Sequence, residues 1–149
     1  MPTPAAGDPA PDFTLDGTHG PFTLSAQRGR RVVLLFYPGD STPVCTRQFC
    51  SYRDRADELG ELDATVVGIS GGDTDAKEAF AAEHGLTVPL LADPDRSVAR
   101  AYGAAPALLG TRRAVVVVDA DGRVAHHNVH LLGLDYAGVD DLREVLAEA

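Results

Sequence analysis

The stretch "RVVLLFYPGDSTPVCTRQFC", residues 31–50, contains an apolar run, a short polar loop and both cysteines of the chain. The run over residues 31–37 is almost uninterrupted, which is typical of a strand buried on both faces of a sheet. Thr42 followed by Pro43 is a strong helix-start pattern, because a threonine side chain caps free backbone N–H groups and proline suits the first helical position. The stretch therefore predicts a buried strand, a loop and a helix over residues 43–59.

The remaining sequence alternates strand and helix patterns. Two short alternating runs around a glycine-rich turn predict a hairpin near the start of the chain, and an Asp-Gly turn predicts a later hairpin. Strands are expected over 13–15, 22–24, 64–70 and 88–93, helices over 73–84, 96–102 and 138–149, and the late hairpin over 114–129. This order predicts an α/β fold: a thioredoxin-like mixed sheet flanked by helices, with an N-terminal β-hairpin extension. One such domain is expected to span residues 1–149.

The chain is acidic, with a formal net charge of −9. Nucleic acids and anionic membranes would repel it, so neither is expected as a partner. The first residues, "MPTPAAGDPAPDF", lack the basic start and apolar core of a signal peptide, and no apolar run approaches the ~20 residues of a membrane-spanning helix. We therefore expect a cytoplasmic location. In a reducing compartment two cysteines rarely form a structural disulfide, which leaves catalysis, metal binding or core packing.

Cys45 falls at the third residue of the predicted helix. A sulfur at this position meets free backbone N–H groups and the positive end of the helix dipole. Reactive cysteines are typically found in such electropositive settings, whereas structural cysteines are buried and inert. Cys45 is therefore a candidate activated nucleophile.

Cys50 lies roughly 140° around the same helix from Cys45 and about 7.5 Å along it. A disulfide requires Cα atoms within about 7 Å, so an intact helix keeps the two sulfurs apart and only local unwinding joins them. This arrangement suits a cycle in which one cysteine reacts and the second resolves the product. A small peroxide is a suitable substrate, because its first product, a sulfenic acid, condenses with a nearby thiol to a disulfide.

The motif as a whole resembles the active-site segment of peroxiredoxins, whose pattern is Pro-x-x-x-Thr-x-x-Cys. Here the matching residues are Pro38, Thr42 and Cys45. A second cysteine five residues later, Cys50, is similar to the Q-type group, the bacterioferritin comigratory proteins. The segments "GDPAPDFTL", "LLADPDRSVARAYG" and "RAVVVVDADGRV" extend the resemblance over nearly the whole chain.

The resemblance implies a thiol-dependent peroxidase with an antioxidant role that reduces hydrogen peroxide and organic hydroperoxides. Cys45 would be the peroxidatic cysteine and Cys50 the intramolecular resolving cysteine. Thr42 would orient the peroxide, and Pro38 would shield the pocket from water. A thioredoxin- or glutaredoxin-type reductant would regenerate the enzyme, with no metal or organic cofactor. Because the resolving thiol lies in the same helix, a monomer is expected.

In that family an arginine before the late apolar strand completes the peroxide site. The spacing to Asp119 assigns this role to Arg113, with the neighbouring Arg112 as a second candidate. The motif departs from the family at Phe49, where a small residue is common beside the resolving cysteine. The bulk of this residue lies in the turn that must unwind, so it bears on the rate of disulfide formation. Gln48 stands where Glu or Gln is usual and is expected to help hold the start of the helix.

Other interpretations of these residues stay open at this point. A thiol–disulfide oxidoreductase on the same fold is less favoured, because that chemistry usually uses a Cys-x-x-Cys spacing. A redox-sensing protein, whose helix opens on oxidation to expose a partner surface, is a third hypothesis. Cys50 is also compatible with an inert core thiol, and Arg113 with a solvated surface charge.

The cluster "HHNVH", residues 126–130, is a candidate metal site. On a strand His126 and His130 would lie about 13 Å apart, too far to share one ion, so exposed edge histidines are expected instead. The two cysteines lack the usual spacing of zinc ligands. The pair Gly71–Gly72 before a helix is a weak anion-binding pattern. No metal site is predicted.

Overall fold

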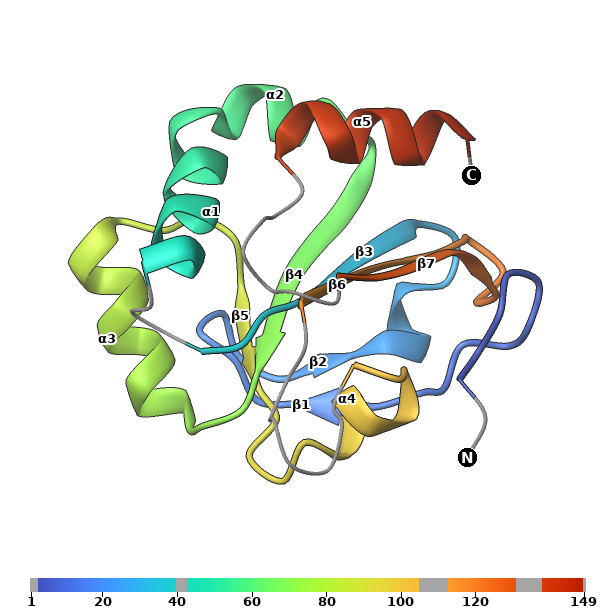
Figure 1. Cartoon of the computed structure of the whole chain (residues 1–149), viewed down its shortest axis with the longest axis horizontal. Helices are drawn as coiled ribbons and strands as arrows, with labels where there is room; N and C mark the ends of the chain where they lie inside the picture. Colours follow the sequence, from blue (N-terminus) through green and yellow to red (C-terminus); the bar gives the residue numbers. More distant parts are fainter. Residues whose placement is uncertain (1–2, 40–42, 105–112, 131–137, 149) are drawn as a thin grey trace.

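The computed structural model describes residues 3–39, 43–104, 113–130 and 138–148 (Figure 1). Its strands are β1 (Thr14–Leu15), β2 (Phe22–Thr23), β3 (Arg31–Phe36), β4 (Ala64–Ser70), β5 (Leu90–Ala92), β6 (Arg113–Val118) and β7 (Val124–His130). Its α-helices are α1 (Pro43–Asp54), α2 (Ala56–Gly60), α3 (Thr74–His84), α4 (Ser97–Ala101) and α5 (Val139–Glu148). A short 3-10 helix, η1 (Leu24–Gln27), follows β2.

A five-stranded mixed sheet in the order β5-β4-β3-β6-β7 forms the centre of the molecule (Figure 1). β3 pairs in parallel with β4 and antiparallel with β6. It is buried from Val32 to Phe36, as expected for an apolar strand covered on both faces. Phe36 at the end of β3 pairs with Ala114 near the start of β6. The end of β3 and the start of β6 therefore lie side by side.

Two apolar cores cover the two faces of the sheet. Because side chains alternate along a strand, Val33 and Leu35 of β3 contribute to one core, and Val32 and Leu34 contribute to the other. Helices α1, α2, α3 and α5 close the first core, whereas β1, β2 and α4 close the second (Figure 1). A mixed sheet flanked by helices, with a small N-terminal sheet of β1 and β2, confirms the predicted α/β class and the N-terminal hairpin.

The prediction of a single helix over residues 43–59 is wrong. It divides into α1 and α2 at Arg55, whose φ of −114° and ψ of 36° are not helical. There the Arg55 side chain contacts two carboxylates: Nε donates to Glu58 Oε2 at 2.5 Å, and Nη2 donates to Asp140 Oδ1 of α5 at 2.8 Å. These hydrogen bonds hold the pKa values of Glu58 and Asp140 below their usual range. The break coincides with a contact to α5 that no local pattern indicates.

Helix α3 begins and ends where the sequence predicts. Asp73 caps it, because its Oδ1 accepts a hydrogen bond from the Ala76 backbone N–H at 2.8 Å. Gly85 follows the last turn with a φ of 62°, the left-handed conformation that glycine adopts without steric cost. The helix is therefore delimited by local chemistry at both ends.

Strands β6 and β7 form the predicted late hairpin, with β7 at the edge of the sheet. Two of the histidines there, His126 and His127, are not the exposed edge residues that the sequence predicts. His126 and His127 are half-buried, and His127 Nε2 lies 2.5 Å from the carbonyl oxygen of Tyr102. Within the described ranges, no group of three or more His, Cys, Asp or Glu side chains is arranged to hold a metal ion. Among the helices that the structure describes, none is long and apolar enough to cross a membrane.

Replacing the cap of α3 tests how much one local contact contributes to the fold. Asp73→Ala removes the acceptor for the Ala76 N–H, so we expect the free energy of unfolding to fall by about 1 kcal/mol. Glu78→Ala, an exposed change in the middle of the same helix, is the control. Urea titration followed by circular dichroism measures both variants. Equal stability of the two variants would contradict the capping role.

Candidate active site around Cys45

Cys45 lies where the central strand leads into α1. The helix begins at Pro43, so Cys45 is its third residue, as the spacing of the motif predicts. Its side chain is 0% exposed. Pro38, two residues after the end of β3, is exposed. Thr42, the predicted cap and peroxide-orienting residue, lies outside the described residues.

Arg113, the first residue of β6, contacts the sulfur of Cys45. Its Nη2 donates a hydrogen bond to Cys45 Sγ at 3.1 Å, although the two residues are 68 positions apart in the chain. The antiparallel pairing of β3 and β6 brings them together, because it places the start of β6 beside the end of β3. The arginine is only 2% exposed, so it is not a solvated surface charge. Arg112, the second candidate, lies outside the described residues.

Gln48 connects the arginine to the body of α1. It lies about one helical turn after Cys45, so both side chains are on the same face. Its Oε1 accepts a hydrogen bond from Arg113 Nη1, and its Nε2 donates to the Tyr52 hydroxyl at 3.0 Å. The sequence alone indicates only that Gln48 helps hold the helix start; its spacing of three residues from Cys45 is the signal for this contact. Arg113 Nε is a buried donor with no acceptor among the described residues.

Cys50 is in the same helix as Cys45. Among the described residues, the side-chain hydrogen bonds of Arg113 go to Cys45 and Gln48 and not to Cys50. It is half-buried, and the helix between the two cysteines is continuous. Both cysteines are free thiols. In this structure the first turns of α1 are therefore wound, and the two sulfurs are too far apart to form a disulfide.

Aromatic rings pack between α1 and the sheet. Phe49 is at their centre: its ring centroid lies 4.8 Å from that of Tyr37, 5.5 Å from that of Tyr52 and 6.4 Å from that of Phe80 on α3. The ring lies over Gly68 of β4, where a Cβ atom would come within 2.7 Å of the Phe49 Cζ atom. Only glycine at this position of β4 leaves room for the ring.

A second buried cation, Lys77 of α3, lies at the same end of the sheet. Its Nζ donates to Ser70 Oγ at 2.5 Å and to the Gly71 carbonyl oxygen at 2.9 Å. It also lies 5.6 Å from the centre of the Tyr37 ring, in the range of a cation–π contact. Lys77 therefore fastens α3 to the residues that follow β3 and β4.

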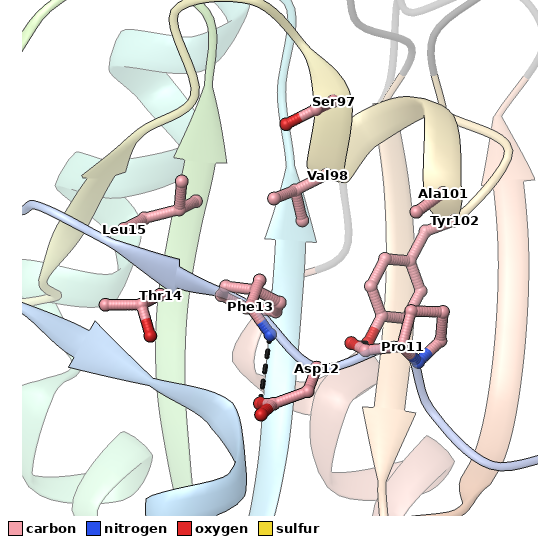
Figure 2. A pocket seen from close by; sticks show the side chains of 9 residues that line it. All are labelled: Pro11, Asp12, Phe13, Thr14, Leu15, Ser97, Val98, Ala101 and Tyr102. Carbon is pink, nitrogen blue, oxygen red and sulfur yellow. Dashed lines mark hydrogen bonds between the residues drawn. The ribbon is translucent and has the colours of Figure 1, made fainter.

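A separate cleft of about 290 Å³ lies on the other face of the sheet, between β1 and α4 (Figure 2). Phe13, Leu15 and Val98 contribute apolar side chains to it, and Tyr102 lies at one end. The Asp12 carboxylate at its rim accepts a hydrogen bond from the Phe13 backbone N–H at 2.9 Å. Of the predicted site residues that the structure describes, none lines this cleft.

The AhpC/TSA family description matches residues 6–127, a range that includes Cys45, Cys50 and Arg113. The chain belongs to this family. A protein of Mycobacterium tuberculosis that is named as a peroxiredoxin is 42% identical over 137 residues, which cover 85% of this chain and 87% of the relative. The chain is thus a peroxiredoxin, and the predicted enzyme class, a thiol peroxidase, is confirmed.

Solved structures support the same assignment. Peroxidoxin BcpB from Mycobacterium tuberculosis matches 97% of this peroxiredoxin and 97% of its own chain, with a TM-score of 0.84 and 34% identity. The bacterioferritin comigratory protein of Xanthomonas campestris, described for its alkyl peroxide reduction activity, matches 96% of this chain and 98% of its own, with a TM-score of 0.83 and 26% identity. The resemblance to the bacterioferritin comigratory group and the thioredoxin-like fold are therefore confirmed.

The hydrogen bonds of Gln48 lead to a test of its role. Gln48→Leu removes the acceptor of Arg113 Nη1 and the donor to Tyr52, so the guanidinium beside Cys45 loses one of its two described acceptors. We expect the oxidation of Cys45 by hydrogen peroxide to slow about tenfold, since an unsatisfied buried partner costs ~1–3 kcal/mol. Rapid quenching followed by mass spectrometry measures the rate. Arg47→Ala, an exposed change at the preceding residue, is the control, and equal rates in the two variants would refute the role.

Proposed function

We propose that this peroxiredoxin is a two-cysteine peroxidase in which Cys45 is the nucleophile and Cys50 resolves the product. The observation that carries the proposal is the 3.1 Å hydrogen bond from Arg113 Nη2 to Cys45 Sγ. A fixed cation beside a cysteine at the start of a helix is the environment of reactive rather than structural cysteines. The substrates are hydrogen peroxide and organic hydroperoxides, and the alkyl peroxide reduction described for the Xanthomonas relative supports the second class.

In the first step the Cys45 thiolate attacks the terminal oxygen of the peroxide. The oxygen–oxygen bond breaks, the sulfur is oxidised to a sulfenic acid, and the leaving oxygen takes a proton and departs as water or an alcohol. Arg113 orients the peroxide and stabilises the charge that develops on the leaving oxygen. Its buried Nε is a donor with no acceptor among the described residues, which supports a part in peroxide binding. Thr42 orients the peroxide from the other side, and Pro38 shields the pocket from water.

In the second step the Cys50 thiol attacks the sulfur of the Cys45 sulfenic acid. A disulfide forms and the sulfenic oxygen leaves as water. The start of α1 must unwind for this step, because five helical residues separate the cysteines by about 7.5 Å along the axis. An external dithiol of the thioredoxin or glutaredoxin type then reduces the disulfide. Since no partner subunit is needed to supply a thiol, the enzyme acts as a monomer.

The surroundings of the enzyme follow from its charge and its chemistry. A cycle that ends with reduction by a dithiol requires a reducing compartment, so we place the enzyme in the cytoplasm. A net charge of −9 disfavours nucleic acid and anionic membrane surfaces as partners. Neither a metal nor an organic cofactor takes part in the steps above, in which two cysteines, a threonine and an arginine act on the peroxide and an external dithiol supplies the electrons.

The intact mass of the reduced protein after one equivalent of hydrogen peroxide tests the cycle. We expect the native chain to lose the mass of two hydrogens as the disulfide forms. Cys50→Ser is expected to accumulate a sulfenic acid that dimedone traps on Cys45, and Cys45→Ser is expected to stay reduced. Arg113→Ala is expected to slow the first step at least about a hundredfold, since removal of one charge-stabilising donor costs ~10²–10³ in rate.

Two results would contradict this function. If Cys45→Ser is oxidised as fast as the native chain, Cys45 is not the nucleophile. If the native chain stays reduced with peroxide but reduces or oxidises a protein disulfide, it is a thiol–disulfide oxidoreductase instead. The Arg47→Ala variant, at an exposed position of the same helix, controls for nonspecific effects of substitution in α1.

A further inference from the structure

Phe49 packs into a niche over Gly68 of β4. The ring lies against the bare Cα of Gly68 on β4, and its side chain is 1% exposed. Tyr37, Tyr52 and Phe80 surround it with mostly edge-to-face ring contacts. The residue is therefore held by close shape complementarity as well as by general burial.

The position of Phe49 in the chain connects its packing to the proposed formation of the disulfide. It is the residue before Cys50, inside the segment that must unwind to join the two sulfurs. Beyond that segment α1 is fastened, because Tyr52 is buried and Arg53 Nη1 donates to the His84 carbonyl oxygen of α3 at 2.5 Å. These contacts lie beyond Cys50, so in the proposed cycle the unwinding falls on the first two turns of α1, where Phe49 lies.

We propose that Phe49 is a positioning residue of the resolving step, which it slows by keeping α1 wound after Cys45 has been oxidised. The inference rests on the proposed two-cysteine cycle. While the helix stays wound, Cys50 is held away and a second peroxide competes for the sulfenic acid. That peroxide transfers one oxygen to the sulfur: its oxygen–oxygen bond breaks, the sulfenic acid becomes a sulfinic acid, and water or an alcohol leaves. Phe49 thereby sets the peroxide concentration at which the enzyme inactivates itself.

The test follows the sulfur of Cys45 with time. The chain has no tryptophan, so rapid quenching with dimedone and an alkylating reagent, followed by mass spectrometry, separates sulfenic acid, disulfide and sulfinic acid. For Phe49→Ala we expect disulfide formation to be about tenfold faster or more, because opening no longer exposes a buried aromatic ring. The peroxide concentration that converts half of the protein to sulfinic acid should rise by the same factor, since the two reactions compete for one intermediate.

A paired variant separates this role from simple loss of stability. In Phe49→Ala/Gly68→Ala the new methyl group on β4 fills part of the vacated niche, with a small shift of the Leu90 side chain 3.1 Å away, so part of the loss in urea midpoint should be recovered while disulfide formation stays fast. Leu142→Ala, a fully buried change on α5 in the same core, should lower the urea midpoint and leave disulfide formation at the native rate. Phe49→Leu provides a milder change with an intermediate acceleration if Phe49→Ala does not fold.

The outcomes distinguish this inference from the function on which it rests. If the Cys50→Ser variant forms no sulfenic acid on Cys45, the proposed function fails and the inference fails with it. If the sulfenic acid forms but neither Phe49 variant resolves it faster than the native chain, only the inference is overturned. It is also overturned if Leu142→Ala accelerates disulfide formation as much as Phe49→Ala, because the effect would then follow stability alone.

Discussion

A single contact between a permanent positive charge and a sulfur atom organises the site. Arg113 and Cys45 meet because β6 starts beside the end of β3, so strand pairing in the centre of the sheet sets the backbone position of Arg113. A buried guanidinium needs acceptors to offset the loss of water. Gln48 supplies one and is itself held by Tyr52, so the first two turns of α1 are tied to the sheet through this charge.

Elements that depend on local chemistry could be predicted from the sequence. The strand that became β3 is recognisable from its apolar run, and α3 from the capping aspartate and the terminal glycine, because these signals act within a few residues. The break at Arg55 could not be predicted, since the carboxylate of Asp140 comes from a helix 85 positions away in the chain. The burial of His127 against the Tyr102 carbonyl likewise depends on how β7 meets the end of α4. In both places a contact between distant segments accompanies the departure from the local pattern.

The candidate site likewise has features that the sequence predicts and features that it does not. The helical position of Cys45 follows from the proline two residues before it, and the resemblance to peroxiredoxins, together with the spacing to Asp119, indicates Arg113. What the sequence does not show is which way the guanidinium points, because that depends on the register between β3 and β6. The contact of Gln48 with Arg113, and the niche that Gly68 offers to Phe49, exist only once α1 lies on the sheet. Both are packing relationships, and a single sequence carries no direct signal for them.

The charge that positions the nucleophile also determines how the proposed cycle ends. When the first turns of α1 unwind, Cys45 and Gln48 leave Arg113, and the arginine loses both of the acceptors described for its Nη atoms. Leaving a buried donor without its hydrogen-bond partner typically costs ~1–3 kcal/mol, so the wound helix is favoured over the opened one. The disulfide holds it open only while the bond exists. Reduction of that bond releases the helix, and the unpaired charge at the start of β6 draws the sulfur back to the position from which it can react again.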